Sequence, residues 1–445
     1  MKNRQIYMDP PKTLVVGFAF IIFIGALFLT LPVATKDGQG LPFLNALFTA
    51  TSATCVTGLV VVDTGTTFTL FGELVILFLI QIGGLGFMTF AIFFSMLLGK
   101  RISLKERLLL QEALNNLSIA GIVRLAKRIL IFTVVIEFIG AILLTIRFAF
   151  DMPLLKAVYY GIFHSVSNFN NAGFDIMGNF KSLTDYVEDP IVTLVISALI
   201  TLGGIGFIVM NEVYEYKRIR RLSLHTKVVL FTSSLLVVVG TILIFMLEFH
   251  NPKTLQPLSA FGKCLASLFQ AVTPRTAGAN TLSISDLHHS TLFIIIILMY
   301  IGASPGSTGG GIKTTTFATL LGAVRSQIKG KEDVIFFRKR IAYGTIYKSL
   351  TVMLAGLSIV IIAAMLLTIT EPGKDFLMIL FEATSAFGTV GLSMGLTPEL
   401  SPLGKIIITL TMFAGRVGPL TIAFAVTLRR NSDPFSYPKG KIMIG

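Results

Sequence analysis

The stretch Thr54-Cys-Val-Thr-Gly-Leu59 decides the fold, because its pattern of a small residue followed by glycine returns three more times. The later copies are Asn170-Asn-Ala-Gly-Phe174, Pro274-Arg-Thr-Ala-Gly278 and Phe387-Gly-Thr-Val-Gly-Leu392. The motif glycines, Gly58, Gly173, Gly278 and Gly391, are separated by 115, 105 and 113 residues. Self-similarity at a nearly fixed period indicates a repeated structural unit. The chain is therefore predicted to contain four copies of one unit.

A second glycine follows each motif glycine at a similar distance. The intervals are 25, 30, 24 and 24 residues, and they end at Gly83, Gly203, Gly302 and Gly415. The segments 81–87 and 201–207 around the first two are nearly the same heptapeptide. The repeat is divergent, but it extends well beyond the motifs themselves.

Each motif lies among apolar stretches of two lengths. Runs long enough to cross the ~30 Å hydrocarbon core precede and follow it, whereas about a dozen residues directly before it suit a re-entrant helix. The first long runs are 13–33, 128–150, 228–249 and 348–370, the short stretches are 42–54, 155–168, 258–271 and 374–385, and the second long runs are 71–98, 190–213, 288–328 with an interruption, and 401–428.

These lengths predict an all-α integral membrane protein built from four tandem units. Each unit would contain a spanning helix M1, a pore helix and a second spanning helix M2. Eight transmembrane helices and four re-entrant pore loops would then surround a central pore. The expected divisions are repeat 1 over 1–99, repeat 2 with its preceding cytoplasmic loop over 100–213, repeat 3 over 214–328, repeat 4 over 329–430, and a short cytoplasmic tail over 431–445.

Composition excludes a soluble globular protein. The chain is 53% hydrophobic and only 13% charged, with a mean hydropathy of +0.81, whereas soluble domains have about 25% charged residues. Lipid must therefore surround much of the chain. The apolar run 13–33 is also longer than the ~7–15 apolar residues of a cleaved signal peptide, so it is expected to be the first membrane helix.

The net charge of +14 reflects membrane topology. Lys and Arg gather in alternate loops, as in 100–107, 217–227 and 325–348, and the other set of loops is relatively acidic. This alternation is the positive-inside rule, which places both termini in the cytoplasm of a multi-pass plasma membrane protein. Membrane topology and contacts with membrane lipid account for the basic loops, a docking surface for an acidic regulatory partner is the alternative, and no nucleic-acid partner is needed.

The sequence contains no arrangement typical of catalysis. Two cysteines and five histidines show no metal-ligand spacing, and no nucleophile with a base lies within the apolar runs. We expect neither an enzyme nor an organic cofactor.

Four re-entrant loops around one axis suit a cation. The C-terminal end of a helix is partially negative, and backbone carbonyls beyond it can replace the hydration shell of a dehydrated cation. Glycine allows unusual backbone angles and close approach of the ion, although a single glycine in a membrane helix often serves close packing instead. The candidate ion-binding residues, here called the motif segments, are Thr54, Cys55, Val56, Thr57 and Gly58; Asn170, Asn171, Ala172 and Gly173; Arg275, Thr276, Ala277 and Gly278; and Gly388, Thr389, Val390 and Gly391.

The four motifs resemble the degenerate filter sequences of the Trk/Ktr/HKT potassium transporters, and the similarity covers nearly the whole chain. The short N-terminus is most similar to the membrane subunit of the Ktr systems. The resemblance implies potassium uptake, often sodium-dependent, with potassium bound only at the filter. It also implies a homodimer with one pore per subunit and a cytoplasmic ring of KtrA-like regulatory subunits that binds ATP or ADP. In plant relatives, serine at the first glycine position accompanies sodium preference, so Gly58 favours potassium.

A polar, glycine-rich segment at 302–314 interrupts the M2 run of repeat 3. Proline and five glycines cannot continue a rigid helix, and unwound backbone at membrane depth must face protein or water. We predict a gate below the filter, as the family resemblance also implies; a packing kink and a phosphate-binding loop are the alternatives. The spacing of Lys313 from the preceding glycine contradicts the phosphate-binding motif. The predicted gate residues are Gly302, Ala303, Ser304, Pro305, Gly306, Ser307, Thr308, Gly309, Gly310, Gly311, Ile312 and Lys313, together with Arg416.

Three basic side chains within the membrane need partners. Arg416, in the middle of the last apolar run, is expected to face the interior, where it can bind gate carbonyls, raise a barrier to cations, or both. Lys313 either reaches the same cavity or extends toward the cytoplasm. Arg275 is expected to point outward and pair with an acid.

An alternating-access transporter is the alternative class. An alternating-access secondary transporter for another small cation would have inverted repeats and a midplane site. The repeats here run parallel, with half-helices that enter from one side, which favours a channel-like pore.

Overall fold

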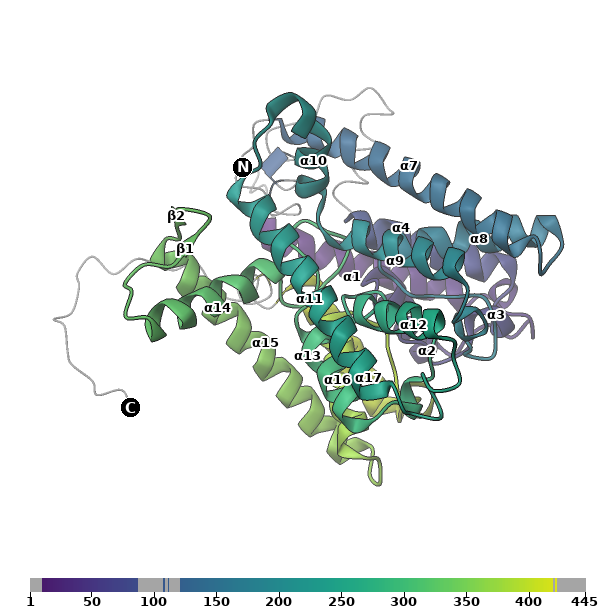
Figure 1. Cartoon of the computed structure of the whole chain (residues 1–445). Coiled ribbons are helices and arrows are strands. Elements are labelled where there is room, and N and C mark those ends of the chain that lie inside the picture. Colours follow the sequence, from purple (N-terminus) through teal and green to yellow (C-terminus); the bar gives the residue numbers. More distant parts are fainter. Residues whose placement is uncertain (1–9, 87–106, 109–110, 112–120, 419–420, 422–445) are drawn as a thin grey trace, which may run out of the picture.

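The computed structural model describes residues 10–86, 107–108, 111, 121–418 and 421 (Figure 1). The predicted cytoplasmic loop that begins repeat 2 lies largely outside the described residues, and so do the extreme N-terminus and the tail.

Four long helices match the predicted first runs of the repeats. Each is long and apolar enough to cross a membrane, and only 22% to 33% of its most apolar window is buried inside the protein. Side chains such as Phe138, 64% exposed, therefore face outward from the bundle. The helices are α1 (Pro10–Leu29), α7 (Ile122–Phe148), α11 (Leu224–Glu248) and α15 (Tyr343–Thr370).

Four short helices match the predicted half-length stretches within a few residues. Two begin directly after a proline, Pro42 or Pro153, and two begin with a side-chain cap from Ser259 or Asp375. Their C-terminal halves are almost wholly buried, as in 48–54. The helices are α2 (Phe43–Thr54), α8 (Leu154–Phe169), α12 (Ala260–Val272) and α16 (Phe376–Gly388).

The second helices of the repeats are shorter than the first. Thr69, Asp189 and Ser401 cap three of them, and each accepts a hydrogen bond from a backbone N–H of the first turn. The helices are α4 (Leu70–Leu85), α9 (Pro190–Gly204), α13 (His289–Tyr300) and α17 (Pro402–Val417). The remainders of the predicted runs 71–98 and 401–428 lie largely outside the described residues.

One predicted continuous run proves to be broken. The stretch 190–213 bends by 99° after α9 and continues as α10 (Phe207–Ile219). Gly206, at the bend, has φ +96°, a conformation open to glycine because it has no Cβ. The prediction treated 190–213 as one run because the first residues beyond the bend, 207–210, are also apolar.

The interruption in repeat 3 is confirmed. Helix α13 ends at Tyr300 and α14 (Thr314–Ile328) begins after 301–313, here called the interrupting loop. A small antiparallel hairpin, β1 (Ile335–Phe336) and β2 (Lys339–Arg340), then precedes α15 and is an exception to the all-α prediction (Figure 1). Its turn residues have positive φ, as in type I′ hairpins. The remaining short elements are η1 (Pro32–Ala34), α3 (Thr64–Thr67), η2 (Thr184–Tyr186), η3 (Ile284–Asp286) and η4 (Thr397–Glu399).

The four units close into a ring. The second helix of each unit packs against the short helix of the next: α4 on α8, α9 on α12, α13 on α16, and finally α17 on α2. One hydrophobic core cluster accordingly joins residues from both ends of the chain, including Phe48 and Met412. Among the described residues, four helices, or five if the bent pair counts as one, have the length and composition of a membrane span.

Candidate functional site

The four motif glycines form a closed ring. A methyl group placed on Gly58 would collide with the carbonyl oxygen of Ala172, the residue before the next motif glycine. The same relation holds from Gly173 to Ala277, from Gly278 to Val390, and from Gly391 back to Thr57. The sequence predicted that these segments share an axis, and the structure brings them together in that way.

Backbone conformation repeats around the ring. All four motif glycines have positive φ, between +64° and +93°. The residues two positions before them also have positive φ. Positive φ is uncommon and costly for residues with a Cβ. Its presence at four matched positions shows that the local geometry is imposed by the surroundings. The residues are Val56, Asn171, Thr276 and Thr389, with φ of +51°, +59°, +73° and +49°.

Hydroxyl groups at the ends of the short helices support the ring. Ser52 Oγ accepts from Gly58 N, and Ser385 Oγ accepts from Gly391 N, each at 3.1 Å. Ser167 Oγ donates instead to Phe174 O at 2.6 Å. The equivalent residue of repeat 3 is Val272, and there the hydroxyl of Thr273 donates to Ala279 O. The three serines and Val272 stand six positions before the motif glycines, a position to which the sequence alone assigned no role.

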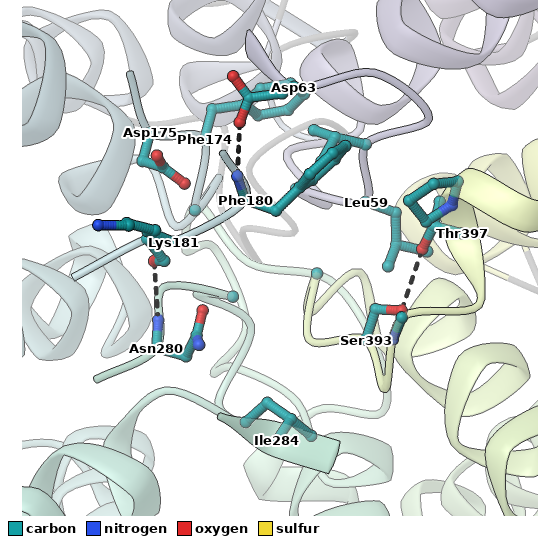
Figure 2. A pocket seen from close by; sticks show the side chains of 18 of the residues that line it. Leu59, Asp63, Phe174, Asp175, Phe180, Lys181, Asn280, Ile284, Ser393 and Thr397 are labelled. Carbon is teal, nitrogen blue, oxygen red and sulfur yellow. Dashed lines mark hydrogen bonds between the residues drawn. The ribbon is translucent and has the colours of Figure 1, made fainter. Parts of the chain in front are cut away.

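A cavity of about 500 Å³ lies on one side of the ring, and all four motif glycines line it. Figure 2 shows Asp63, Asp175 and Lys181 on one part of its wall and Ser393 and Thr397 on another. Residues from all four repeats therefore build one vestibule. The sequence identified these loops as acidic without placing their carboxylates at the motif segments.

The two vestibule carboxylates differ in their bonding. Asp63 accepts hydrogen bonds from Thr66 N and Phe180 N, both at 2.7 Å. Asp175 accepts from Met177 N at 3.0 Å. Burial raises the pKa of the Asp175 carboxyl to about 7; the Met177 bond lowers this pKa, and the charge of Asp63 raises it. Asp175 can therefore change charge near neutral pH.

The interrupting loop lies against the opposite side of the motif segments. Thr308 Oγ1 donates to Asn171 Oδ1 at 2.8 Å, and Gly310 N donates to Thr389 Oγ1 at 3.1 Å. A methyl group on Gly309 would collide with Thr276 Oγ1. The loop thus contacts the residue with positive φ in three of the four motif segments, namely Asn171, Thr276 and Thr389.

The bend after α9 also holds this loop. Ser304 N donates to Gly204 O at 2.9 Å, and Thr308 N donates to Gly203 O at 3.2 Å. Phe207 N donates to Gly306 O at 2.8 Å. Because Phe207 is the first residue of α10, this helix begins directly on the loop.

Two basic side chains bind the loop carbonyls. Arg416 donates to Thr308 O and to Gly83 O of α4, so it ties the loop to another helix. Lys313 Nζ donates to Gly309 O at 2.8 Å and to Gly310 O at 3.4 Å. Of the two alternatives for Lys313, the structure favours the protein interior over the cytoplasm, because its ammonium group binds carbonyls of the loop itself.

The prediction for Arg275 is wrong. Its side chain is 5% exposed and donates to Ser233 in α11, through Nη2 to Oγ at 2.9 Å and through Nη1 to the carbonyl at 3.4 Å. No acid partner of Arg275 occurs among the ion pairs of the described residues. Sequence reasoning expected a charge partner, whereas in the structure a neutral hydroxyl and a backbone carbonyl of α11 accept from the guanidinium.

Sequence reasoning also missed two carboxylates within apolar helices. Glu382 of α16 accepts hydrogen bonds from Ser393 Oγ at 2.8 Å and from the Thr397 hydroxyl, and so holds the vestibule wall. Glu137 of α7 contacts the second motif segment through Asn170. A charged residue in an apolar run is a signal that could have identified both. The described residues contain no group of three or more His, Cys, Asp or Glu side chains that could hold a metal.

Comparison with known proteins agrees with this architecture. The family model described as TrkH, cation transport protein, matches residues 7–436. The Ktr system potassium uptake protein B of Bacillus subtilis (strain 168) is 48% identical over 442 residues, covering 99% of this chain and 98% of that protein. The potassium/sodium uptake protein NtpJ of Enterococcus hirae is 40% identical, covering 100% of this chain and 99% of that protein.

A solved structure is similar in fold. The crystal structure of the potassium transporter TrkH from Vibrio parahaemolyticus matches with a TM-score of 0.71 and 18% identity, covering 96% of this chain and 86% of that one. The family model and the curated relatives cover nearly the whole sequence, and apolar helices of spanning length form the outside of the bundle. The chain is therefore a multi-pass membrane protein that belongs to the Trk/Ktr family of cation transport proteins.

Proposed function

We propose that this chain takes up potassium as the ion-conducting membrane subunit of a Ktr-type system, acting as a transporter and not as an enzyme. The observation that carries the proposal is the closed ring of four motif glycines between an open vestibule and a loop that covers the opposite side. Relatives named as potassium uptake proteins match almost the full length.

The motif segments act as the selectivity filter in this proposal. Four helix C-termini end just before the ring, and their partial negative charge favours a cation over an anion. Backbone carbonyls of the four segments replace the water shell of potassium. The glycines permit this arrangement because each faces a neighbouring carbonyl with no room for a Cβ. The four repeats, with eight spanning helices and four re-entrant loops, supply the symmetry.

The interrupting loop acts as the gate. It contacts three motif segments from the side opposite the vestibule, and its glycine-rich backbone can rearrange at low steric cost. Arg416 fixes its closed position by binding loop and α4 carbonyls together. A cation in this position also disfavours passing potassium ions until the loop moves.

The remaining elements of the proposal come from the family. We propose a homodimer in the plasma membrane with both termini cytoplasmic, controlled by a KtrA-like ring that binds ATP or ADP. Sodium would serve as a coupling or activating ion, in keeping with the name of the potassium/sodium uptake relative.

The test is cation uptake into liposomes that contain the purified chain, comparing potassium, rubidium, sodium and lithium. Uptake that favours potassium and rubidium is the expected result. Uptake without preference would keep the pore but contradict the filter assignment. Absence of uptake in folded protein whose loop residues 306–311 are deleted would contradict ion conduction itself.

A further inference from the structure

A carboxylate within the membrane lies behind the second motif segment. Glu137 is near the middle of α7, whose neighbouring side chains Val134 and Phe138 are each 64% exposed on the apolar surface. Glu137 itself points inward, toward the ends of α8 and α4. Ionisable residues in membrane helices are rare and usually functional. None of the ion pairs among the described residues involves Glu137.

The partners of Glu137 are two amide side chains. Asn170 Nδ2 donates to Glu137 Oε1 at 2.9 Å, and Gln81 Nε2 donates to Glu137 Oε2 at 3.3 Å. Asn170 Nδ2 also lies 2.9 Å from Gln81 Oε1 and 2.9 Å from Val166 O. An amide has two N–H donors, so three acceptors surround two protons. This cluster holds Asn170 in one orientation.

Asn170 is a member of the second motif segment, which makes the cluster relevant to the filter. The next residue, Asn171, has φ +59° and accepts from Thr308 of the interrupting loop at 2.8 Å. Asn170 thus binds the segment to α7, and the next residue, Asn171, binds it to the interrupting loop. A methyl group on Gly84 would collide with Asn170 Oδ1, so α4 also fits closely around this side chain.

The arrangement is specific to repeat 2. The residues at the position of Asn170 in the other motif segments are Cys55, Arg275 and Gly388, and Arg275 instead binds Ser233 of α11. Neither cysteine nor glycine offers an amide group. A general packing requirement of the fold would therefore not explain a carboxylate here.

We infer that Glu137 is a positioning residue for ion selectivity: its carboxylate, acting through the Asn170 amide, fixes the backbone of the second filter segment. This inference rests on the proposed filter. It assigns to α7, an outer helix that does not contribute to the motif segments, an influence through Asn170 on which cation passes.

The experiment compares Glu137→Gln, Glu137→Leu, Asn170→Ala and the double variant Glu137→Leu/Asn170→Ala in liposomes. The ratio of rubidium to sodium uptake and the half-saturating rubidium concentration are measured for each. Glu137→Leu should lower the ratio about tenfold, the upper end of what the loss of one buried hydrogen bond costs. Glu137→Gln should stay within about twofold of the unchanged chain, because its amide oxygen still accepts from Asn170.

The double variant should lose no more selectivity than Asn170→Ala alone, since residues in one hydrogen-bonded network are not additive. Phe138→Leu, on the exposed face of the same helix, is the matched control and should leave the ratio unchanged. An unchanged ratio in folded Glu137→Leu, an equal loss in Glu137→Gln, or additive losses in the double variant would each overturn the inference. If Glu137→Leu does not fold, Asn170→Ala with an unchanged ratio overturns it equally. A lack of rubidium preference in the unchanged chain would instead refute the proposed filter.

Discussion

The second helices of repeats 3 and 4 occupy equivalent places in the ring but meet the motif segments differently. In α17, Gly415 lies so close to Phe387 O that a Cβ would collide with it. Gly83 and Gly203 face Thr54 O and Phe169 O in the same way. Gly302, the matching residue after α13, faces Gly310 O of the interrupting loop instead. In repeats 1, 2 and 4, a glycine of the second helix packs against the carbonyl at the end of the short helix of the same repeat. In repeat 3, the matching glycine packs against the interrupting loop instead.

The difference shows which motif segment lies on a loop where the others lie on a helix. In three repeats a helix glycine meets the first residue of the motif segment (Thr54) or the residue directly before it (Phe169, Phe387) with no space for a Cβ. The third motif segment rests on a loop that is held by hydrogen bonds and two basic side chains. Neutral hydrogen bonds contribute a net of about 0.5–1.5 kcal/mol each and those of charged groups about 1.5–3 kcal/mol, so in the proposed gate the loop would move by exchanging these bonds and not by dismantling a helix.

Replacing the helix glycine should have the largest effect. Gly415→Val should reduce potassium uptake by about 100-fold, because the new side chain must displace the Phe387 carbonyl and overpacking costs about 1–3 kcal/mol. Uptake into liposomes and thermal unfolding in detergent measure the two consequences. Gly302→Val, which meets only the loop, is the matched variant and should retain selectivity. Normal, selective uptake by Gly415→Val would show that the contact of α17 with the Phe387 carbonyl is no more important than the contact of Gly302 with the loop.

Deleting 306–311 should have the next largest effect, in the opposite direction. Potassium uptake should rise about tenfold without any regulatory partner, which corresponds to removing about 1.4 kcal/mol of bias toward the closed state. Selectivity should persist because the ring of motif glycines remains. Unchanged uptake by folded protein would show that the interruption of repeat 3 is only a packing feature.

Substitutions of the motif glycines should have the same effect in repeats 3 and 4. Gly278→Ser and Gly391→Ser should each lower the ratio of potassium to sodium uptake about tenfold, because each new Cβ meets the carbonyl oxygen of the next segment and perturbed filter carbonyls discriminate less well. Gly373→Ser is the control, since Gly373 also has positive φ, +87°, but no atom within 4 Å of an added Cβ. Equal ratios in Gly278→Ser and the control would exclude Gly278 from the filter.

The vestibule should give the smallest effect. Since the pKa of Asp175 is raised to about 7, its carboxylate is charged above that pH and neutral below it. Lowering the external pH from 8 to 6 should therefore reduce potassium uptake at low concentration by about two- to threefold, as the attraction of the vestibule for cations weakens. Asp175→Asn should show the lower uptake at both pH values, and Lys181→Met should keep the pH dependence. An unaltered pH profile in Asp175→Asn would contradict this role.

Much of the local structure could be predicted from composition and spacing. The half-length helices were predicted to end within a few residues of their observed ends, and the break after Tyr300 was expected from its glycine and proline content. These features depend on short-range properties: apolar length against bilayer thickness and the conformational freedom of glycine. The bend at Gly206 carried no comparable signal, because glycines in an apolar run, here Gly203, Gly204 and Gly206, are also common in straight membrane helices, where they allow close packing.

By itself, the sequence determined that the chain lies in a membrane, that one unit occurs four times, and that the third unit is interrupted. Only the tertiary structure decided that Gly391 closes the ring against Thr57, that Arg275 turns to Ser233, and that Glu137 binds Asn170. The physical reason is range. Apolar length and glycine content act within a few residues, whereas these contacts join residues that are 33 to more than 300 positions apart in the chain. Their geometry exists only once the last helix, α17, has packed against the first short helix, α2.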